Sequence, residues 1–356
     1  MATIVMAGGG TGGHVVPLLA VARELKQRGH EPVFIGTRTG FEAKLVPPSG
    51  FVLEFIEIGG LKRVGLIKTF RTLMQLPLSV RTVLSLFKKY SPAAVFSMGG
   101  YAAGPVVLAA LLKRVPLVVM EPNAMPGLTN RQVGRFVTRA LLSFEDAARF
   151  FPPGKSEITG LPVRREFFSI IRKAPESKPT LLITGGSQGS RTLNQAARES
   201  WTYFNEGGLA VRFLHQTGSA PHEALARKFN ESGMEGQVLP FIDDMPAAFR
   251  QADLVICRAG AGALAELAAS GKPSILVPLP TAADQHQLRN AEAFQKAGAA
   301  VLVLDAEMNG GRFFEEVAKL TSQPELLKRM GERARTFAHP GADRRAADIV
   351  EEVIRH

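Results

Sequence analysis

The stretch TIVMAGGGTGG, residues 3–13, aligns without a gap with TLLITGGSQGS, residues 180–190. Each begins with five residues that are apolar or threonine and continues into a loop rich in glycine. A helix-length segment follows each loop. A buried strand that leads through a glycine turn into a helix is the first unit of a nucleotide-binding α/β fold. The repeat therefore predicts two such folds in one chain.

Short apolar runs alternate with helix-length segments along the rest of the chain. Runs of this kind are typical of parallel strands that are buried on both faces of a sheet. The predicted fold class is therefore α/β, with doubly wound parallel sheets. The expected strands are residues 3–7, 32–35, 52–56, 93–97, 117–120, 140–144 and 157–159, followed by residues 180–184, 211–215, 237–240, 254–257, 274–277 and 300–304.

A chain of 356 residues is too long for one ordinary core, so two domains are expected. We place the first domain at residues 1–161 and the second at residues 162–336. The last helix, in about residues 337–356, is expected to pack back onto the first domain.

The net charge of +11 is concentrated in the first half. Residues 1–150 carry 18 Lys and Arg against 8 Asp and Glu. An anionic partner would fit this half: phospholipid headgroups, a pyrophosphate or nucleic acid. The alternative is a generally basic surface.

Several features favour a cytoplasmic protein. The N-terminus leads directly into the first predicted strand and lacks the basic leader of a signal peptide. The longest apolar run, residues 101–112, contains Gly104 and Pro105 and is too short to span a bilayer. The single cysteine, Cys257, excludes an intrachain disulfide and fits a reducing compartment.

Four glycine-rich turns follow predicted strands, at residues 8–13, 99–104, 185–191 and 258–266. Glycine lets the backbone approach a ligand, and a helix N-terminus offers N–H groups to an anion. Ligands of open α/β sheets bind beyond the carboxyl ends of the strands, so we expect the turns to share one cleft. The alternative is that the glycines only tighten strand-to-helix turns.

Gly8, Gly10 and Gly13 also satisfy G-x-G-x-x-G, which is a weak signal for a dinucleotide. The second strand ends in IGTR, residues 35–38, without an acidic residue for a ribose. An NADP-dependent oxidoreductase that uses Arg38 therefore stays open as an alternative.

Motifs in order along the whole chain resemble the MurG family, the bacterial N-acetylglucosaminyltransferases that convert lipid I to lipid II in peptidoglycan synthesis. They are GGGTGGH at 8–14, GGYAAGP at 99–105, EPNAMPGLTNR at 121–131, TGLPVR at 159–164, GGSQGSR at 185–191, FIDDM at 241–245 and DQHQLRNA at 284–291. The resemblance implies the GT-B architecture, in which two Rossmann-like domains face each other across a cleft.

The resemblance also implies the reaction and its participants. UDP-GlcNAc would give its sugar, with inversion, to the 4-hydroxyl of the N-acetylmuramyl unit of lipid I. The enzyme would be peripheral on the cytoplasmic face of the inner membrane, where other cell-wall synthesis or division proteins are expected partners and nucleic acid is not. A UDP-GlcNAc epimerase of the same fold is the alternative from another enzyme class.

Site residues carried over from the family lie in both predicted domains. In the second, Glu266 would accept hydrogen bonds from the ribose hydroxyls, which suits a carboxylate. Ser187 would contact the diphosphate, Ile242 would meet the uracil through its backbone, and Gln287 would bind the sugar hydroxyls. The remaining donor-site residues are Thr11, Gly12, Gly13, Asn123, Arg164, Ala261, Gly262, Ala263, Leu264 and Ala265.

His14 is the candidate catalytic base, because histidine accepts a proton near neutral pH and this one ends the first glycine turn. Gly99, Gly100 and Tyr101 are assigned to the acceptor side. Glu121 stays open as another base.

The sequence contains no Asp-x-Asp, the metal-binding signature of the other large glycosyltransferase fold, so no tightly bound metal is expected. No cofactor is assigned. Ala103, Pro122 in EPN and Ala263 depart from the residues usual in the family, which puts fine contacts in doubt and not the reaction class.

Residues 62–89 interleave basic and apolar side chains. Such a surface can lie in an anionic bilayer interface, although the apolar stripe could instead be core. The residues expected to face the membrane are Leu66, Ile67, Lys68, Phe70, Arg71 and Leu73.

Overall fold

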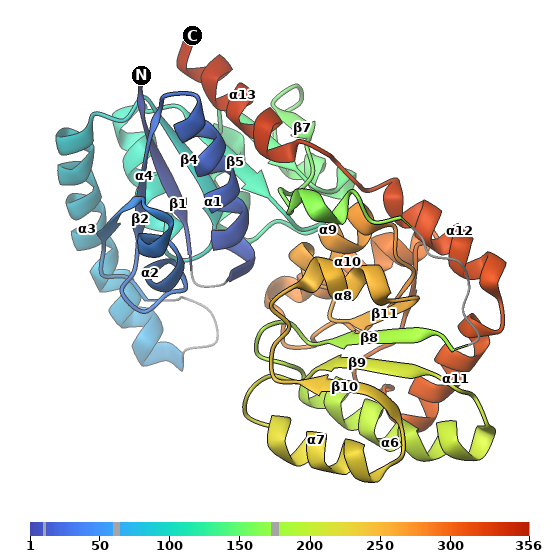
Figure 1. Ribbon diagram of the computed structural model, residues 1–356. Helices are drawn as coiled ribbons and strands as arrows, with labels where there is room; N and C mark the ends of the chain where they lie inside the picture. Colours follow the sequence, from blue (N-terminus) through green and yellow to red (C-terminus); the bar gives the residue numbers. More distant parts are fainter. Residues whose placement is uncertain (10–11, 60–64, 172–177, 356) are drawn as a thin grey trace. The chain divides into compact units, whose positions relative to one another are not determined.

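The computed structural model describes residues 1–9, 12–59, 65–171 and 178–355, and of residues 65–74 it describes the backbone alone. Thr11 and the side chains of Leu66, Ile67, Lys68, Phe70, Arg71 and Leu73 lie outside the described part. The chain divides into two compact units (Figure 1): unit 1 holds Met1–Val163 and Gly341–His356, and unit 2 holds Arg164–Pro340.

Unit 1 is built on a seven-stranded sheet in the order β3-β2-β1-β4-β5-β6-β7. All six strand pairs are parallel, and the central strands are buried on both faces, as their apolar sequences require. The strands are β1 (Thr3–Gly8), β2 (Glu31–Gly36), β3 (Val52–Phe55), β4 (Ala94–Gly99), β5 (Leu117–Glu121), β6 (Arg139–Leu142) and β7 (Ser156–Ile158).

Helices cover both faces of this sheet (Figure 1). One helix, α3, continues through Pro77 without a break. The core beneath α3 and α4 includes Val83, Phe87 and Val106. The helices are α1 (Gly12–Gln27), α2 (Glu42–Leu45), α3 (Gly65–Tyr90), α4 (Ala103–Lys113), α5 (Leu128–Val133) and α13 (Ala342–Arg355).

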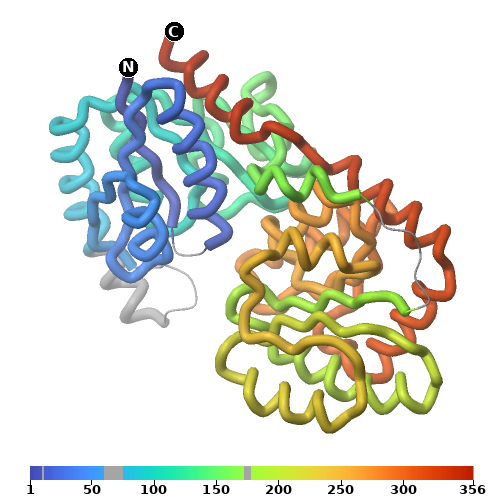
Figure 2. The backbone as a smooth tube through the Cα atoms, viewed as in Figure 1, coloured from blue at the N-terminus to red at the C-terminus, as the bar shows by residue number. Residues whose placement is uncertain are grey.

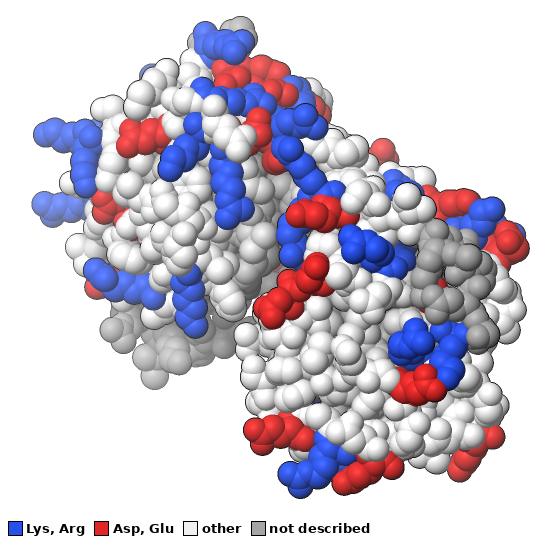
Figure 3. Space-filling model, viewed as in Figure 1, with Lys and Arg blue, Asp and Glu red and all other residues white. Residues whose placement is uncertain are grey.

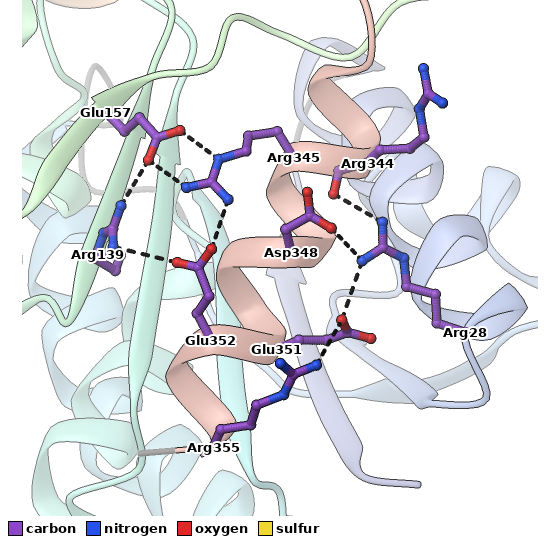
Figure 4. A network of polar contacts seen from close by, with 9 residues as sticks. All are labelled: Arg28, Arg139, Glu157, Arg344, Arg345, Asp348, Glu351, Glu352 and Arg355. Atoms are coloured by element: carbon purple, nitrogen blue, oxygen red, sulfur yellow. Dashed lines mark hydrogen bonds and ion pairs between the residues drawn. The ribbon is translucent and has the colours of Figure 1, made fainter.

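The C-terminal helix α13 packs against α1 of unit 1, so the two ends of the chain share one unit (Figure 2). Its apolar face is buried, with Ile349 and Val350 fully covered. Its polar face forms a network of ion pairs (Figure 4). The contacts are Arg28 Nη1 to Asp348 at 2.6 Å and to Glu351 at 3.3 Å, Arg345 Nε to Glu157 at 2.6 Å, Arg139 Nη2 to Glu157 at 2.8 Å, Arg139 Nη1 to Glu352 at 3.7 Å, Arg345 Nη1 to Glu352 at 2.7 Å and Arg355 Nη2 to Glu351 at 3.6 Å.

Unit 2 repeats the plan with a six-stranded parallel sheet in the order β10-β9-β8-β11-β12-β13. Side chains that accept a hydrogen bond from the first helical turn start three of its helices: Ser190 for α6, Asp244 for α8 and Asn309 for α11. The strands are β8 (Thr180–Thr184), β9 (Arg212–Gln216), β10 (Glu235–Leu239), β11 (Leu254–Cys257), β12 (Ser274–Leu276) and β13 (Ala300–Leu302).

The helices of unit 2 lie on both faces of its sheet (Figure 1): α6, α7 and α11 on one, and α8, α9 and α10 on the other. An aromatic cluster that includes Trp201, Phe204 and Phe313 fills the core under α6 and α11. The helices are α6 (Arg191–Gly207), α7 (His222–Glu231), α8 (Met245–Gln251), α9 (Ala261–Ser270), α10 (His286–Lys296), α11 (Gly310–Thr321) and α12 (Pro324–Arg335).

The predicted fold class is confirmed, and each of the thirteen expected strands overlaps a strand of the structure. Boundaries differ by a few residues. The strand expected at residues 237–240, for example, is β10 at Glu235–Leu239, because its first residues are exposed on an edge strand and carry no apolar signal. No helix in the described ranges is long and apolar enough to span a membrane.

Candidate functional site

The first glycine turn connects β1 to α1 and places His14 in the first turn of that helix. His14 Nδ1 lies 3.2 Å from the carbonyl oxygen of Gly9. The turn after β4 packs directly on this arrangement: a Cβ on Gly100 would lie 2.9 Å from Gly9 O and 3.3 Å from His14 Nδ1. Gly100 also has a positive φ of 82°, so the close approach and the backbone conformation both require glycine.

A buried carboxylate, that of Glu42, lies beneath the first turn. Glu42 Oε1 accepts hydrogen bonds from the backbone N–H and the hydroxyl of Thr37, both at 2.8 Å. The carboxyl group fills the space where side chains of three glycines would be: Cβ atoms on Gly9, Gly36 and Gly40 would come within 2.6, 2.4 and 2.1 Å of Glu42 side-chain atoms. Glu42 therefore packs closely against Gly9, at the start of the turn.

The Thr37 hydroxyl also lies 3.3 Å from the hydroxyl of Tyr101, a residue assigned to the acceptor side. The sequence interpretation did not identify Glu42 or Thr37. The sequence shows only part of the pattern that marks Glu42. Gly36 and Gly40 lie near it in the chain, but Gly9 comes close only when β1 pairs with β2.

A second buried carboxylate, Glu121 at the end of β5, organises the loop that carries Asn123. Its Oε1 accepts from the backbone N–H and the side-chain amide of Asn123 at 3.0 and 3.1 Å. Its Oε2 accepts from the Gly127 N–H and the Asn130 amide, both at 3.0 Å. Burial raises the pKa of Glu121, and these hydrogen bonds oppose the rise. With both oxygens engaged and 1 % exposed, Glu121 is suited to hold Asn123 in place rather than to act as a base.

In unit 2, the turn from residue 185 to 190 follows β8 and is held tightly to neighbouring strands. Gly186 adopts a φ of 83°, which leaves Ser187 exposed at the tip of the turn. The Gln216 amide donates to Thr184 Oγ1 at 3.2 Å and to Gly186 O at 2.9 Å, while its Oε1 accepts from the backbone N–H of Ile242 at 2.8 Å. Gln216 thus positions both Ser187 and Ile242, and the N–H of Ile242 is already engaged.

The turn after β11 leads into α9, whose N-cap is Gly260. A helix start leaves its first N–H groups without partners inside the helix, so Ala261, Gly262 and Ala263 offer backbone donors to an anion. Leu264 is buried and anchors the helix, while Ala265 is partly exposed. The turns after β8 and β11 belong to adjacent strands and therefore lie next to each other.

Glu266 is partly buried in the second turn of α9, and its environment is unusual for a carboxylate. Burial raises the pKa of Glu266 to about 7, against an opposing attraction from Arg164. The negative charge of Glu266 in turn adds to burial in raising the pKa of the Cys257 thiol, to about 12. Arg164 is exposed and lies with its guanidinium 5.3 Å from the centre of the Phe167 ring. A carboxyl group that titrates near neutrality is typical of a functional site.

Gln287, near the start of α10, is fixed in orientation because its Oε1 accepts from the backbone N–H of Leu279 at 2.9 Å. Its amide NH2 is thereby the end that points away from Leu279. Two consecutive non-glycine residues just before it, Asp284 and Gln285, have positive φ values of 51° and 53°. Such conformations cost about 1 kcal/mol or more each and cluster at functional sites.

The four glycine turns thus form two pairs, one pair at the carboxyl ends of β1 and β4 in unit 1 and one at those of β8 and β11 in unit 2. The structure places His14 beside Gly100, whose neighbours in the chain are Gly99 and Tyr101, and it places Glu266 near Arg164. Gly12 and Gly13 begin α1. Within the described residues there is no group of His, Cys, Asp and Glu side chains that could hold a metal ion.

Comparison with known proteins gives a consistent relationship over the whole chain. The glycosyltransferase family 28 N-terminal domain matches residues 4–142, and the family 28 C-terminal domain matches residues 180–352. A UDP-N-acetylglucosamine–N-acetylmuramyl-(pentapeptide) pyrophosphoryl-undecaprenol N-acetylglucosamine transferase from Solibacter usitatus is 59% identical over 99% of this chain and 97% of its own length. The transferase of the same name from Myxococcus xanthus is 39% identical over 98% of this chain and 92% of its own.

Among solved structures, the crystal structure of Acinetobacter baumannii MurG superposes with a TM-score of 0.84 at 30% identity, and covers 99% of this chain and 100% of its own. The chain therefore belongs to glycosyltransferase family 28 and, within it, to the UDP-N-acetylglucosamine–N-acetylmuramyl-(pentapeptide) pyrophosphoryl-undecaprenol N-acetylglucosamine transferases.

Proposed function

We propose that this chain transfers N-acetylglucosamine from UDP-GlcNAc to the 4-hydroxyl of the N-acetylmuramyl unit of lipid I, giving lipid II for peptidoglycan synthesis. The observation that carries this function is the 59% identity over 99% of the chain to a relative named for that transfer. The same relationship decides against the UDP-GlcNAc epimerase and the NADP-dependent oxidoreductase.

UDP-GlcNAc binds to unit 2 in this proposal. Glu266 accepts hydrogen bonds from the two ribose hydroxyls, which requires its ionised form. The N–H groups at the start of α9 and the Ser187 hydroxyl hold the diphosphate and stabilise the charge that develops on it as the sugar departs. Because the Ile242 N–H is bonded to Gln216, recognition of uracil at this residue falls to the Ile242 carbonyl oxygen.

The other donor-site residues have supporting parts. Gln287 donates from its oriented amide to a sugar hydroxyl. Arg164 supplies positive charge beside Glu266. Thr11, Gly12, Gly13 and Asn123 of unit 1 also contact the donor, an assignment that rests on the family resemblance.

His14 acts as the base that takes the proton of the acceptor hydroxyl. With its Nδ1 proton donated to the Gly9 carbonyl, the lone pair lies on Nε2, where it can accept that proton. Gly99, Gly100 and Tyr101 line the acceptor side next to His14. The attack inverts the anomeric carbon through an oxocarbenium-like transition state. The residues supply this chemistry by positioning and proton transfer, and the proposal requires no metal.

The enzyme works as a peripheral protein on the cytoplasmic face of the inner membrane, where its lipid-linked acceptor resides. The excess of Lys and Arg in residues 1–150 supports attraction to an anionic membrane surface. The segment with Leu66, Ile67, Lys68, Phe70, Arg71 and Leu73 docks on that surface, and other cell-wall synthesis or division proteins are its expected neighbours.

The test is UDP release from UDP-GlcNAc by the purified protein with and without a lipid I analogue. We expect release only when the analogue is present, with formation of one disaccharide product per UDP. Release without an acceptor, together with an epimerised sugar, would assign the chain to the epimerase class instead.

A further inference from the structure

A pocket of about 600 Å3 lies between α6 and α7 of unit 2. Its volume falls within the usual range for small-molecule sites. The lining residues of each helix are three or four positions apart, so they lie on one face of that helix. The lining residues are Gln188, Ser190, Arg191, Asn194, Gln195 and Arg198 from the glycine turn and α6, and Thr217, Ala220, Pro221, Ala224, Leu225 and Lys228 from the side of α7.

This pocket does not include the residues assigned to UDP-GlcNAc, although one end of it is formed by the glycine turn that carries Ser187. The helices α6 and α7 cover one face of the unit 2 sheet, whereas α9 with Glu266 covers the other (Figure 1). None of the donor-site residues lines the pocket. A ligand for this pocket must therefore be inferred from the side chains that line it.

The charges in the pocket have one sign. Arg191, Arg198 and Lys228 line it, and no acidic side chain does. Within residues 1–9, 12–59, 75–171 and 178–355, none of these three side chains has a hydrogen-bond or ion-pair partner. Two basic side chains elsewhere in unit 2 do have acidic partners: Arg258 pairs with Asp305 and Arg312 with Glu316. Three unpaired cations around one pocket strongly favour an anion.

The acidic residue next to Arg198 is directed elsewhere. Glu199 Oε1 accepts from the Gln195 amide at 2.8 Å, and its Oε2 accepts from the backbone N–H of Gly310 at the start of α11. Glu199 is thus used to join α6 to α11. The positive charge of the pocket is left uncompensated by the protein.

The end and the floor of the pocket are rigid. The loops before α6 and α7 interlock at two glycines with positive φ: a Cβ on Gly189 would lie 1.8 Å from Thr217 O, and one on Gly218 would lie 2.4 Å from Gln188 O. Both ends of the Asn194 amide are held: its Oδ1 lies 2.9 Å from His215 Nε2, and its Nδ2 donates to Thr217 O at 2.9 Å. A preorganised site loses less entropy when it binds.

We propose that the pocket between α6 and α7 binds a small organic phosphate. Its phosphate group contacts Arg191, Arg198 and Lys228, because guanidinium groups bind phosphate oxygens in pairs and an ammonium adds a point charge. Its apolar part packs on Pro221, Ala224 and Leu225.

The test is calorimetric titration of the full chain with phenyl phosphate and with inorganic phosphate, at constant ionic strength and with UDP at saturation. UDP occupies the donor residues, so the signal reports a second site. We expect phenyl phosphate to bind more tightly than inorganic phosphate. Arg191→Gln with Arg198→Gln should weaken phenyl phosphate binding at least tenfold, because two charge-assisted contacts are lost.

The matched control is Lys328→Gln with Arg329→Gln, which removes the same charge from the exposed side of α12. This pair should bind phenyl phosphate as the wild type does. A third variant, Ala224→Glu, places an acid at an exposed pocket position one turn before Lys228 and should abolish binding. No saturable binding to the wild type, or an equal loss in both double variants, overturns the proposal.

Discussion

The hydrogen bond between His14 and Gly9 gives the histidine a single useful tautomer. A proton on Nδ1 satisfies the Gly9 carbonyl and leaves the lone pair on Nε2. The same contact also anchors the glycine turn, so removal of His14 could act through proton transfer or through the turn. The two effects can be separated with an isosteric replacement.

We predict that His14→Asn and His14→Ala both lower kcat by about 10²- to 10⁴-fold with a smaller change in the KM for UDP-GlcNAc. The asparagine amide can still donate to Gly9 O, but it cannot accept a proton from the substrate. Steady-state kinetics with a lipid I analogue measure both constants. Turnover close to wild type in His14→Asn would show that the residue only anchors the turn.

Glu266 should make donor binding depend on pH. Its pKa of about 7 means that the carboxyl group is protonated below that pH and accepts ribose hydrogen bonds poorly. We predict that the KM for UDP-GlcNAc falls as the pH rises through about 7. In Glu266→Gln the KM should be about tenfold higher at pH 8 and nearly independent of pH, since one or two hydrogen bonds to a charged group are weakened. An unchanged pH profile in the variant contradicts the role.

The same residue should destabilise the free protein. A carboxyl pKa raised above its ordinary value favours the fold at low pH, and this contribution is lost as the pH rises from about 4.5 to about 7. Glu266→Gln should therefore raise the free energy of unfolding at pH 8, by at most about 3 kcal/mol, while it impairs binding. Urea denaturation measures this, with the exposed Glu231→Gln as the control that should change nothing.

Glu42 contacts Gly9 of the first glycine turn and also packs against Gly36 and Gly40, which lie outside that turn. We predict that Gly40→Ala lowers kcat at least tenfold, because the new Cβ would lie 2.1 Å from Glu42 Oε2 and must displace the carboxyl group that supports Gly9. Gly104→Ala is the control, since a Cβ there meets no atom within 4 Å. Equal kinetics for the two variants would contradict a positioning role for Glu42.

Sequence patterns identified the residues that lie at strand ends and missed those that support them. Glycine turns, His14 and Glu266 are visible because local spacing and family motifs mark them. Gln216 was not predicted, because its partners Thr184 and Gly186 are brought near only by the pairing of β8 with β9. Glu42 was not predicted either: its bonds to Thr37 are local, but its contact with Gly9 arises only when β1 pairs with β2. Such contacts have no local signature in one sequence.

At the scale of the elements, the attachment of α13 to unit 1 depends on charge. Arg345 lowers the pKa of the Glu157 carboxyl through a hydrogen bond, and Arg139 adds to the effect. A lowered pKa contributes stability above the ordinary value near 4.5, and this is lost as the pH falls through the folded-state pKa. The attachment of α13 should therefore loosen in acid.

We predict that Glu157→Gln speeds amide hydrogen exchange across residues 342–355 at pH 7, by an amount that corresponds to about 1 kcal/mol for partly exposed pairs. Exchange in unit 2 should not change. The exposed Glu145→Gln serves as the control. Faster exchange spread evenly over the whole chain would show a global effect instead.

Elements with a strong apolar pattern were predicted closely, and those shaped by contacts were not. The strand expected at residues 254–257 has the same bounds as β11, because both of its faces are buried and its whole sequence is apolar. The helix α3 continues through Pro77, whose effect on the register the sequence could not decide. A proline removes one hydrogen bond, and packing of α3 on α4 compensates for it.

At the scale of the whole molecule, charge is distributed unevenly. Lys and Arg side chains are spread over the face of unit 1 seen in Figure 3. Because residues 1–150 account for nearly all of the net charge, attraction to anionic lipid should come from this unit.

We predict that the protein floats with anionic liposomes, less so at high salt, and less so for Phe70→Ser with Leu73→Ser. Ile171→Ser with Leu304→Ser is the matched control, because these unit 2 side chains are 82% and 43% exposed. Equal flotation of both double variants would place the docking surface elsewhere.

Unit 1 takes its last helix, α13 (Ala342–Arg355), from the part of the chain that follows the whole of unit 2. The ribosome releases the chain from residue 1 onward, so unit 2 is fully synthesised before unit 1 can be completed. Until then the surface of α1 that α13 will cover stays exposed to water and to chaperones. Arg28 and His30 lack their partner Glu351 during this time. A chain cut short within its final helix would carry a finished second unit and an unfinished first one.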